Sequence, residues 1–392
     1  IARVSDFQNL VPPEKSRFFN WSKPFVQLET TRGCFNTCAF CVSGGEKPVR
    51  PLPIEVIRER LQIIHRHGIK NVRVLDRTFN YSSRRAKELL ELFREFSPDI
   101  RFHLEIHPAL LSEELKEELK HLPQGLLHLE AGIQSLREPV LVQSRRMGKL
   151  ADALEGLKFL CALPNMETHA DLIAGLPLYR LSEIFEDIRV LAAYGAGEIQ
   201  LESLKLLPGT EMRRRAEELG IQYASFPPYE VLQTRQITVD ELQTARQLSR
   251  LLDGFYNAPA WQGITRKLIL KYDMFLHEFL QHLIQKGWAD QPMSLEKRGL
   301  ILYDFCKQQY PEYQLEASIA WIEAGMSLKK VPAETVRTKR QTPPEQWEVL
   351  YGEYRENLRL CFLPSGEGEN RGYWFGFESE IQKAEPVFKA KN

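Results

Sequence analysis

Apolar residues follow two alternating patterns between about residue 25 and residue 230. Short runs with apolar and polar residues in alternation predict strands, and longer runs with apolar residues three or four apart predict amphipathic helices. The expected strands span 25–30, 71–76, 101–107, 126–131, 167–173 and 198–205. The expected helices span 53–67, 83–96, 112–121, 149–161, 182–194 and 210–219. Strand and helix repeated six times predict an α/β fold with a parallel sheet and right-handed crossovers.

Residues typical of helix ends fall near these boundaries. Ser83, Ser112 and Ser182 are expected N-caps, because a serine hydroxyl accepts a hydrogen bond from the first turn. Gly68 and Gly220 lie where two of the helices are expected to end.

The expected strands carry a polar face. Alternate residues of a strand point to the same side, so each strand shows one polar and one apolar set. A packed barrel interior is filled with branched apolar residues, whereas this pattern predicts a lumen that holds a polar ligand. Exposure of this face to solvent is the alternative, and helices beside every strand argue against it. The polar set is Gln27, Glu29, His103, Glu105, His107, His128, Glu130, Gly132, Gln134, His169, Asp171, Gln200 and Glu202.

The alternation stops after about residue 235. Further helices are expected over 239–253, 264–286, 295–310 and 313–325. A basic, proline-containing stretch follows, and then a segment rich in tryptophan, tyrosine and phenylalanine. The expected organisation is a linker-like segment at 1–20, a core domain at 21–235, a helical domain at 236–328, and a basic linker with an aromatic-rich tail at 329–392.

The composition is that of a globular protein with balanced charge. The 392 residues include 52 basic and 52 acidic side chains, which gives no general argument for a nucleic-acid or anionic-membrane partner. No apolar run reaches the ~18 residues of a membrane span, and no signal peptide is visible. We expect a cytoplasmic protein without a membrane partner. Residue 1 is Ile, so we also expect that the chain lacks an N-terminal part.

Three cysteines lie close together after the first expected strand, at Cys34, Cys38 and Cys41. Thiolates are the usual ligands of iron–sulfur clusters, and three of them leave one iron of a four-iron cluster open. A structural zinc site needs a fourth ligand, which is missing at suitable spacing. Buried thiols that act only as small apolar groups have no reason to cluster. A disulfide framework does not suit a long chain without a secretory signal.

The CxxxCxxC spacing of these cysteines resembles that of the radical S-adenosylmethionine (SAM) superfamily. The resemblance implies a partial (β/α)6 barrel, a [4Fe–4S] cluster on the three cysteines, and SAM bound to the open iron. Phe40 matches the aromatic position near the adenine. Asp76 falls in the motif that receives the SAM amino group, although Leu-Asp-Arg here replaces the usual Gly-Gly-Glu.

The Gly-Ile-Gln-Ser motif that contains Gln134 resembles one in oxygen-independent coproporphyrinogen oxidases and cobalamin-dependent radical SAM enzymes. By that likeness Gln134 and Asp171 bind the ribose hydroxyls, and Glu105 lies close to SAM. Arg146 matches an arginine that pairs with the SAM carboxylate, with Arg145 as the alternative. A guanidinium suits a carboxylate, and hydroxyls suit amide or acidic side chains.

A closer likeness covers about residues 25 to 250. The stretches 74–80, 204–210 and 227–232 resemble a bacterial subgroup of cobalamin-binding radical SAM proteins. Members of that subgroup have an N-terminal cobalamin domain and a C-terminal helical domain of unknown function. The cobalamin domain is absent from this chain, so cobalamin, where it is used, is held by a domain outside it.

The resemblance implies reductive cleavage of SAM to a 5′-deoxyadenosyl radical that abstracts hydrogen from a substrate. With cobalamin, methyl transfer is the expected outcome. Without it, an oxidoreductase similar to oxygen-independent coproporphyrinogen oxidase is the alternative. The implied partners are a small-molecule or peptide substrate and a reductant such as flavodoxin or ferredoxin.

Two other functions are alternatives to these reactions. A methylthiotransferase needs a second cluster, and Cys161, Cys306 and Cys361 are too scattered in sequence to indicate one. A nucleic-acid or protein-binding module would use the basic run at 329–340 with the aromatic-rich tail. A basic run is more commonly a solvated loop.

Overall fold

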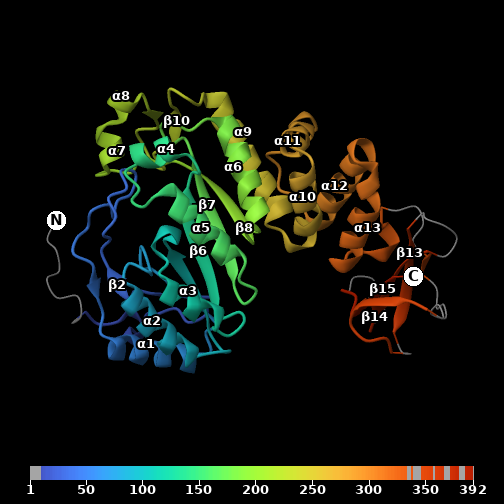
Figure 1. Ribbon diagram of the computed structural model, residues 1–392, viewed down its shortest axis with the longest axis horizontal. Helices are drawn as coiled ribbons and strands as arrows, with labels where there is room; N and C mark the ends of the chain where they lie inside the picture. Colours follow the sequence, from blue (N-terminus) through green and yellow to red (C-terminus); the bar gives the residue numbers. More distant parts are fainter. Residues whose placement is uncertain are drawn as a thin grey trace. The chain divides into compact units, whose positions relative to one another are not determined.

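The computed structural model describes residues 10–332, 337–338, 346–355, 358–365, 371–378 and 385–391. The chain forms two compact units, Ile1–Ser249 and Arg250–Asn392 (Figure 1). The boundary between these units lies inside the helix α9 (Val239–Leu251), whereas the sequence predicted a domain boundary at residues 235–236, before that helix.

The first unit is built on a six-stranded parallel sheet whose strands follow chain order (Figure 1). All six predicted strands are present, and helices connect them as expected for a partial (β/α)6 barrel. The α/β fold class is therefore confirmed. The strands are β1 (Val26–Leu28), β4 (Asn71–Val74), β5 (Arg101–Ile106), β6 (Leu127–Gln134), β7 (Glu167–Ala174) and β8 (Glu198–Ser203).

Amphipathic helices cover the apolar face of this sheet. Phe93 of α2, for example, stacks on Phe102 of β5 with ring centroids 4.0 Å apart. Burying one such ring stabilises the fold by about 1.5–3 kcal/mol.

The helix predicted over 210–219 is two short helices, α7 and α8, and α4 was not predicted. The helices are α1 (Ile54–Arg66), α2 (Ser83–Arg94), α3 (Glu113–Lys120), α4 (Glu138–Gln143), α5 (Leu150–Cys161), α6 (Leu181–Tyr194), α7 (Glu211–Arg214), α8 (Ala216–Leu219) and α9 (Val239–Leu251).

The helix caps agree with the sequence in part. Ser112 caps α3 as predicted, with its hydroxyl accepting from the Leu115 amide. The cap of α2 is Ser82 instead of Ser83. Ser182 lies inside α6, so its prediction as an N-cap is wrong. Gly68 and Gly220 adopt positive φ at helix ends, as their backbone freedom allows.

Two short antiparallel pairs that the sequence did not predict complete this unit. The pairs are β2 (Thr31–Arg32) with β3 (Arg50–Pro51), and β9 (Gln222–Tyr223) with β10 (Val231–Gln233). Residues 33–49 lie between β2 and β3, so the first pair closes the loop that carries the three clustered cysteines.

The second unit begins with helices. The predicted single helix over 264–286 is wrong, because one helix ends at Lys271 and the next starts at Phe275. Trp261 and Trp321 are fully buried between the helices. In the described ranges, no helix is long and apolar enough to cross a membrane. The elements are the π-helix η4 (Leu252–Tyr256), α10 (Pro259–Lys271), α11 (Phe275–Gln285), α12 (Leu295–Gln309) and α13 (Gln314–Glu323).

An antiparallel sheet of order β11-β13-β14-β15-β12 follows where a basic linker and a tail were expected. Leu360, Trp374 and Phe388 lie in its core, so the aromatic residues pack internally. Lys330 is paired with Glu296, whereas Lys339 and Arg340 of the basic run lie outside the described residues. The strands are β11 (Arg337–Thr338), β12 (Glu348–Tyr351), β13 (Arg359–Pro364), β14 (Gly372–Phe377) and β15 (Phe388–Lys391).

Candidate functional site

The cysteine loop is a compact turn closed by its own backbone. The Cys34 amide donates to the Glu46 carbonyl (3.0 Å), and the Cys41 amide donates to the Cys38 carbonyl (3.1 Å). A Cβ atom at Gly44 would lie 2.6 Å from the Cys38 carbonyl oxygen, so only glycine fits there. The loop therefore holds the three cysteines in a fixed turn.

Neighbouring segments anchor this loop. The Ala39 amide donates to the Ser144 carbonyl (2.9 Å), and the Met212 amide donates to the Ala39 carbonyl (2.8 Å). The Met147 amide donates to the Asn36 side-chain oxygen (3.3 Å). These bonds tie the segment after α4 and the start of α7 to the cysteines.

Arg146 comes from that anchored segment and faces the cysteines. Its Nη1 lies 3.7 Å from the Cys38 sulfur, and its Nη2 donates to the Gly132 carbonyl at the end of β6. Cys34 and Cys38 are buried, and Cys41 is half-buried. Burial raises the pKa of the Cys38 thiol, Arg146 opposes this rise, and the nearby Cys41 and Cys34 thiols add to it.

The two adjacent arginines have different surroundings. Arg145 turns away from the cysteines, and its Nη1 pairs with Glu211 (2.5 Å). Gln134 has a positive φ of 71° at an irregularity in the β6–β7 pairing. The Gln134 side-chain nitrogen packs against Gly132, and a Cβ atom at Gly132 would lie only 2.5 Å from it. The end of β6 thus places Gln134 beside Arg146 and the cysteine loop.

Asp76 follows β4, and its carboxylate is hydrogen-bonded to other residues of the protein. It accepts from the backbone amides of Thr30 (2.8 Å) and Thr31 (2.9 Å) and from the Thr30 hydroxyl. Burial raises the pKa of Asp76, and these hydrogen bonds oppose the rise. The side chain therefore joins the ends of β1 and β4. Phe40, half-buried, precedes Cys41 in the loop.

The polar face of the sheet lines a cavity of about 620 Å³. The alternation predicted for β5, β6 and β8 is present, with the apolar residues buried and the polar residues partly accessible. His107 departs from the prediction, because it follows the strand and is buried, which lowers its pKa to about 3. The charged and polar residues lining the cavity include His103, Glu105, His128, Glu130, His169 and Glu198.

The carboxyl groups of this face have unequal pKa values. Burial, and then the charge of Glu130, raise the pKa of Glu105 to about 7, while Arg77 opposes the rise. Burial raises the pKa of Asp171 to about 6, while His169 opposes the rise. A hydrogen bond from His103 (2.7 Å) lowers the pKa of Glu130. Perturbed carboxyl groups that line a cavity are typical of functional sites.

The donor set fits the cofactors that the cysteine spacing implies. Three thiols in one closed loop match the protein ligands of a four-iron cluster with one open iron. A guanidinium beside a cysteine sulfur can bind a carboxylate. The amide of Gln134 and the carboxyl groups of Asp171 and Glu105 can hold hydroxyl groups.

Comparison with known families defines the class of the first unit. Residues 28–191 match the radical SAM superfamily. Residues 217–328 match a family described as a protein of unknown function, DUF4080. The chain therefore contains a segment that matches the radical SAM superfamily, followed by a region that matches this uncharacterised family, in agreement with the superfamily and the C-terminal domain of unknown function that the sequence resembles.

Individual relatives match part of the chain. The ribosomal protein uS12 methylthiotransferase RimO of Moorella thermoacetica is 28% identical over 195 residues, which are 46% of this chain and 43% of that protein. An uncharacterized methyltransferase of Pyrococcus horikoshii is 24% identical over 65% of this chain and 54% of its own length. The radical SAM methyltransferase TsrM of Kitasatospora setae superposes with a TM-score of 0.45 and 19% identity, over 52% of this chain and 42% of that one.

Some residues in and beside the cavity were not singled out from sequence. Glu198 is the first residue of β8, and Arg101 and Glu167 begin β5 and β7. Each lies two residues before a polar residue of the same strand face, so the alternation of polar and apolar residues could have identified them. Strand ends are the least certain part of such a pattern, and these three residues lie there.

Proposed function

We propose that this chain is a radical SAM enzyme that binds a [4Fe–4S] cluster and SAM and acts on a substrate in the cavity of the sheet. The observation that carries the proposal is the approach of the Arg146 guanidinium to the Cys38 sulfur, 3.7 Å away, within a closed loop of three cysteines. The match of residues 28–191 to the radical SAM superfamily supports it.

In this proposal Cys34, Cys38 and Cys41 hold the cluster as thiolates. Arg146 pairs with the SAM carboxylate. Gln134 and Asp171 accept hydrogen bonds from the ribose hydroxyls. The cluster and SAM together supply one-electron cleavage of a carbon–sulfur bond, which yields methionine and a 5′-deoxyadenosyl radical able to abstract hydrogen.

Further residues position SAM and shape its surroundings. Glu105 lies on the polar face near Arg77, whose Nη1 is 4.0 Å from the Glu105 carboxylate. Phe40 packs beside the adenine, and the backbone at Asp76 receives the SAM amino group. The apolar sides of the strands and the helices over them exclude water from the sheet core, which a reactive radical requires.

We further propose methyl transfer to a small molecule or peptide as the reaction, with cobalamin held by a domain outside this chain. The printed names of the Moorella and Pyrococcus relatives, a methylthiotransferase and a methyltransferase, support transfer of a one-carbon or methylthio group. A cytoplasmic reductant such as flavodoxin or ferredoxin would supply the electron. Retention of added hydroxocobalamin by the purified chain after gel filtration would contradict the assignment of cobalamin to another domain.

Methylthio transfer itself is less well supported, because it needs a second cluster. Within the described residues, Cys161 lies on α5, Cys306 on α12 and Cys361 on β13. Burial raises the pKa of the Cys306 and Cys361 thiols to about 12, so both are inert at neutral pH. These three cysteines therefore fall on three separate elements.

Product analysis tests the proposed activity. The chain is reconstituted anaerobically with iron and sulfide, reduced with dithionite and incubated with SAM, and the quenched mixture is separated by liquid chromatography. We expect 5′-deoxyadenosine and methionine in equal amounts. A reconstituted, reduced protein that leaves SAM intact would contradict the proposal. The matched control is the Cys38→Ala variant, which should give neither product.

A further inference from the structure

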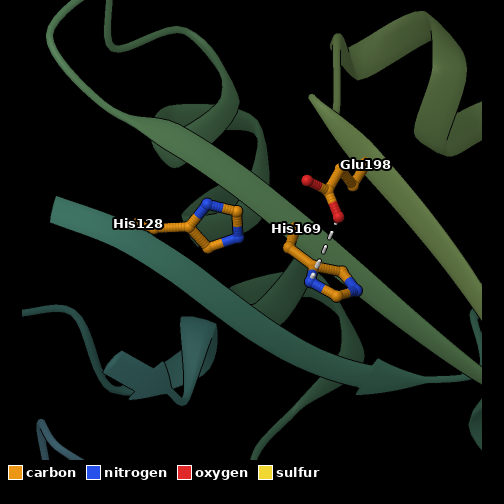
Figure 2. Close-up of side chains that lie close together, drawn as sticks. All are labelled: His128, His169 and Glu198. Atoms are coloured by element: carbon orange, nitrogen blue, oxygen red, sulfur yellow. Dashed lines mark ion pairs between the residues drawn. The ribbon is translucent and has the colours of Figure 1, made fainter. Parts of the chain in front are cut away.

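Three side chains with metal-binding atoms converge on the polar face of the sheet, His128 of β6, His169 of β7 and Glu198 of β8 (Figure 2). One ligand atom from each lies within 4.8 Å of the other two. His169 and Glu198 are partners in the β7–β8 register, and His169 Nδ1 lies 3.9 Å from a Glu198 carboxylate oxygen. We propose that these three residues bind a divalent transition metal ion, with Zn²⁺ as the ion that fits best.

Each histidine has a carboxylate near one of its ring nitrogens. His128 Nδ1 lies 3.4 Å from Glu167, and His169 Nε2 lies 2.9 Å from Asp171. A metal-binding histidine commonly donates its second N–H to a carboxylate, which fixes the tautomer and orients the ring. For His169 this arrangement leaves Nδ1, the nitrogen that lies 3.9 Å from the Glu198 carboxylate, free of a proton and able to bind a metal. In Figure 2 the ring of His128 points toward the other two side chains.

The surrounding groups hold the His128 ring and balance the charge. Arg101 Nη2 lies 3.0 Å from His128 Nδ1 and 2.6 Å from the Glu167 carboxylate, so Glu167 neutralises this cation. The His103 ring stacks on His128, with centroids 4.8 Å apart and planes 14° apart, and is itself bonded to Glu130. The carboxyl groups of Glu130, Glu167, Asp171 and Glu198 surround these histidines and outnumber the neighbouring Arg101 guanidinium, which favours a cation.

The ligand types select the kind of metal. Two imidazoles and one carboxylate suit Zn²⁺ and similar transition metals, whereas Mg²⁺ and Ca²⁺ prefer oxygen ligands throughout. Zinc bonds to these atoms are ~2.0–2.2 Å long, so small side-chain rotations bring the three ligands onto one ion. Three protein ligands leave one position open, and that position faces the cavity of about 620 Å³. A substrate oxygen or a water molecule can occupy it.

The site lies away from the cysteine loop. His128, His169 and Glu198 are among the first three residues of their strands, whereas Gln134 and Asp76 lie at or beyond strand ends. Because the strands are parallel, their first residues share one edge of the sheet and their last residues share the other. The metal site and the cysteine loop therefore lie at opposite edges of the sheet, with Asp171 beside His169 between them, and the existence of the metal site does not depend on the proposed radical chemistry.

A cobalt titration tests the site in the 392-residue chain. The background carries Cys34→Ser, Cys38→Ser and Cys41→Ser, so that no thiolate of the loop competes for the metal. Co²⁺ binding is followed by visible absorption, and Zn²⁺ and Mg²⁺ are then added. We expect one Co²⁺ per chain with weak bands of nitrogen and oxygen coordination, displaced by Zn²⁺ and not by Mg²⁺.

Variants in this background locate the metal. Glu198→Gln and His169→Ala should each weaken Co²⁺ binding at least about tenfold. Glu202→Gln is the matched control, because Glu202 lies on the same strand and face, and it should bind as the background does. Glu198 is partly exposed, so its isosteric variant keeps the fold. No saturable binding in the background, or equal affinity in the background and Glu198→Gln, would overturn the proposal.

The same comparison is made on the chain with native cysteines, with zinc content measured after dialysis. We expect about one zinc fewer in Glu198→Gln than in the wild type. Equal zinc content in the two proteins would count against the site whatever the state of the cluster.

Discussion

Arg146 connects the cysteine loop with the end of β6, and its guanidinium lies beside the Cys38 sulfur. We expect Arg146→Ala to weaken SAM binding roughly 10- to 100-fold, because a hydrogen bond to a charged group contributes about 1.5–3 kcal/mol. Equilibrium dialysis of the reconstituted protein measures this, and the cluster absorption should stay unchanged. Arg145→Ala is the control, since Arg145 pairs with Glu211 instead. Equal losses in both variants would count against the assignment.

The three cysteines are expected to act as one ligand set. Cys34→Ala, Cys38→Ala and Cys41→Ala should each abolish cluster assembly, because a missing thiolate exposes a second iron. Iron and sulfide content after reconstitution is the measurement. Cys161→Ala, on α5, should reconstitute as the wild type does. A normal iron content in any of the three loop variants would refute the assignment.

Glu105 gives a pH dependence with a definite sign. Its pKa is raised from 4.5 to about 7, so the folded chain keeps a proton that the unfolded chain releases. Stability from this group therefore falls as pH rises from about 4.5 to about 7. The melting temperature of Glu105→Gln minus that of the wild type should therefore be larger at pH 8 than at pH 5. Calorimetry of the cluster-free protein measures this difference. A pH-independent difference would show that Glu105 titrates normally.

At the scale of elements, Asp187 of α6 holds the segment that follows β6. Its buried carboxylate accepts from the Leu136 amide (2.9 Å), Arg137 Nε (2.9 Å) and the Tyr179 hydroxyl (2.6 Å). We expect Asp187→Ala to cost about 3 kcal/mol in the free energy of unfolding, because the partners lose a buried charge. Urea denaturation measures the cost. Glu186→Ala is the control, since Glu186 pairs with the same arginine at the surface.

The sheet of the first unit could be predicted because its strands alternate strictly. In β6 every second residue from Leu127 to Ile133 is buried, and the residues between are polar or glycine. Helices between strands then force parallel pairing in chain order. Gln134 and Arg146 came from a family likeness, because nothing local in the sequence shows that a turn after α4 returns to the cysteine loop.

Two features escaped prediction for physical reasons. The break between α10 and α11 lies at residues 272–274, Tyr-Asp-Met, which carry no glycine or proline to signal it. The C-terminal sheet pairs β12 with β15 across the intervening hairpin, and such long-range pairing leaves no local pattern. Its aromatic residues therefore resembled a tail in the sequence, although Trp374 and Phe388 form a core.

For the molecule as a whole, the described chemistry gathers in the first unit. The cysteine loop and Arg146 lie in the segment that matches the radical SAM superfamily, whereas the region matching the family of unknown function consists largely of helices that bury apolar residues. The two proposed sites lie at opposite ends of the strands. The proposed cofactor site lies at the strand ends, and the proposed metal site lies at the strand starts, with Asp171 beside His169 between them.

The central claim is that the cysteine loop holds a cluster to which SAM binds directly. Electron paramagnetic resonance of the reduced, reconstituted chain, recorded with and without SAM, tests it most directly. We expect a [4Fe–4S]⁺ signal whose g values change when SAM is added, and an Arg146→Ala sample that needs more SAM for the same change. A cluster signal that is identical with and without saturating SAM, or no cluster at all, would contradict the account.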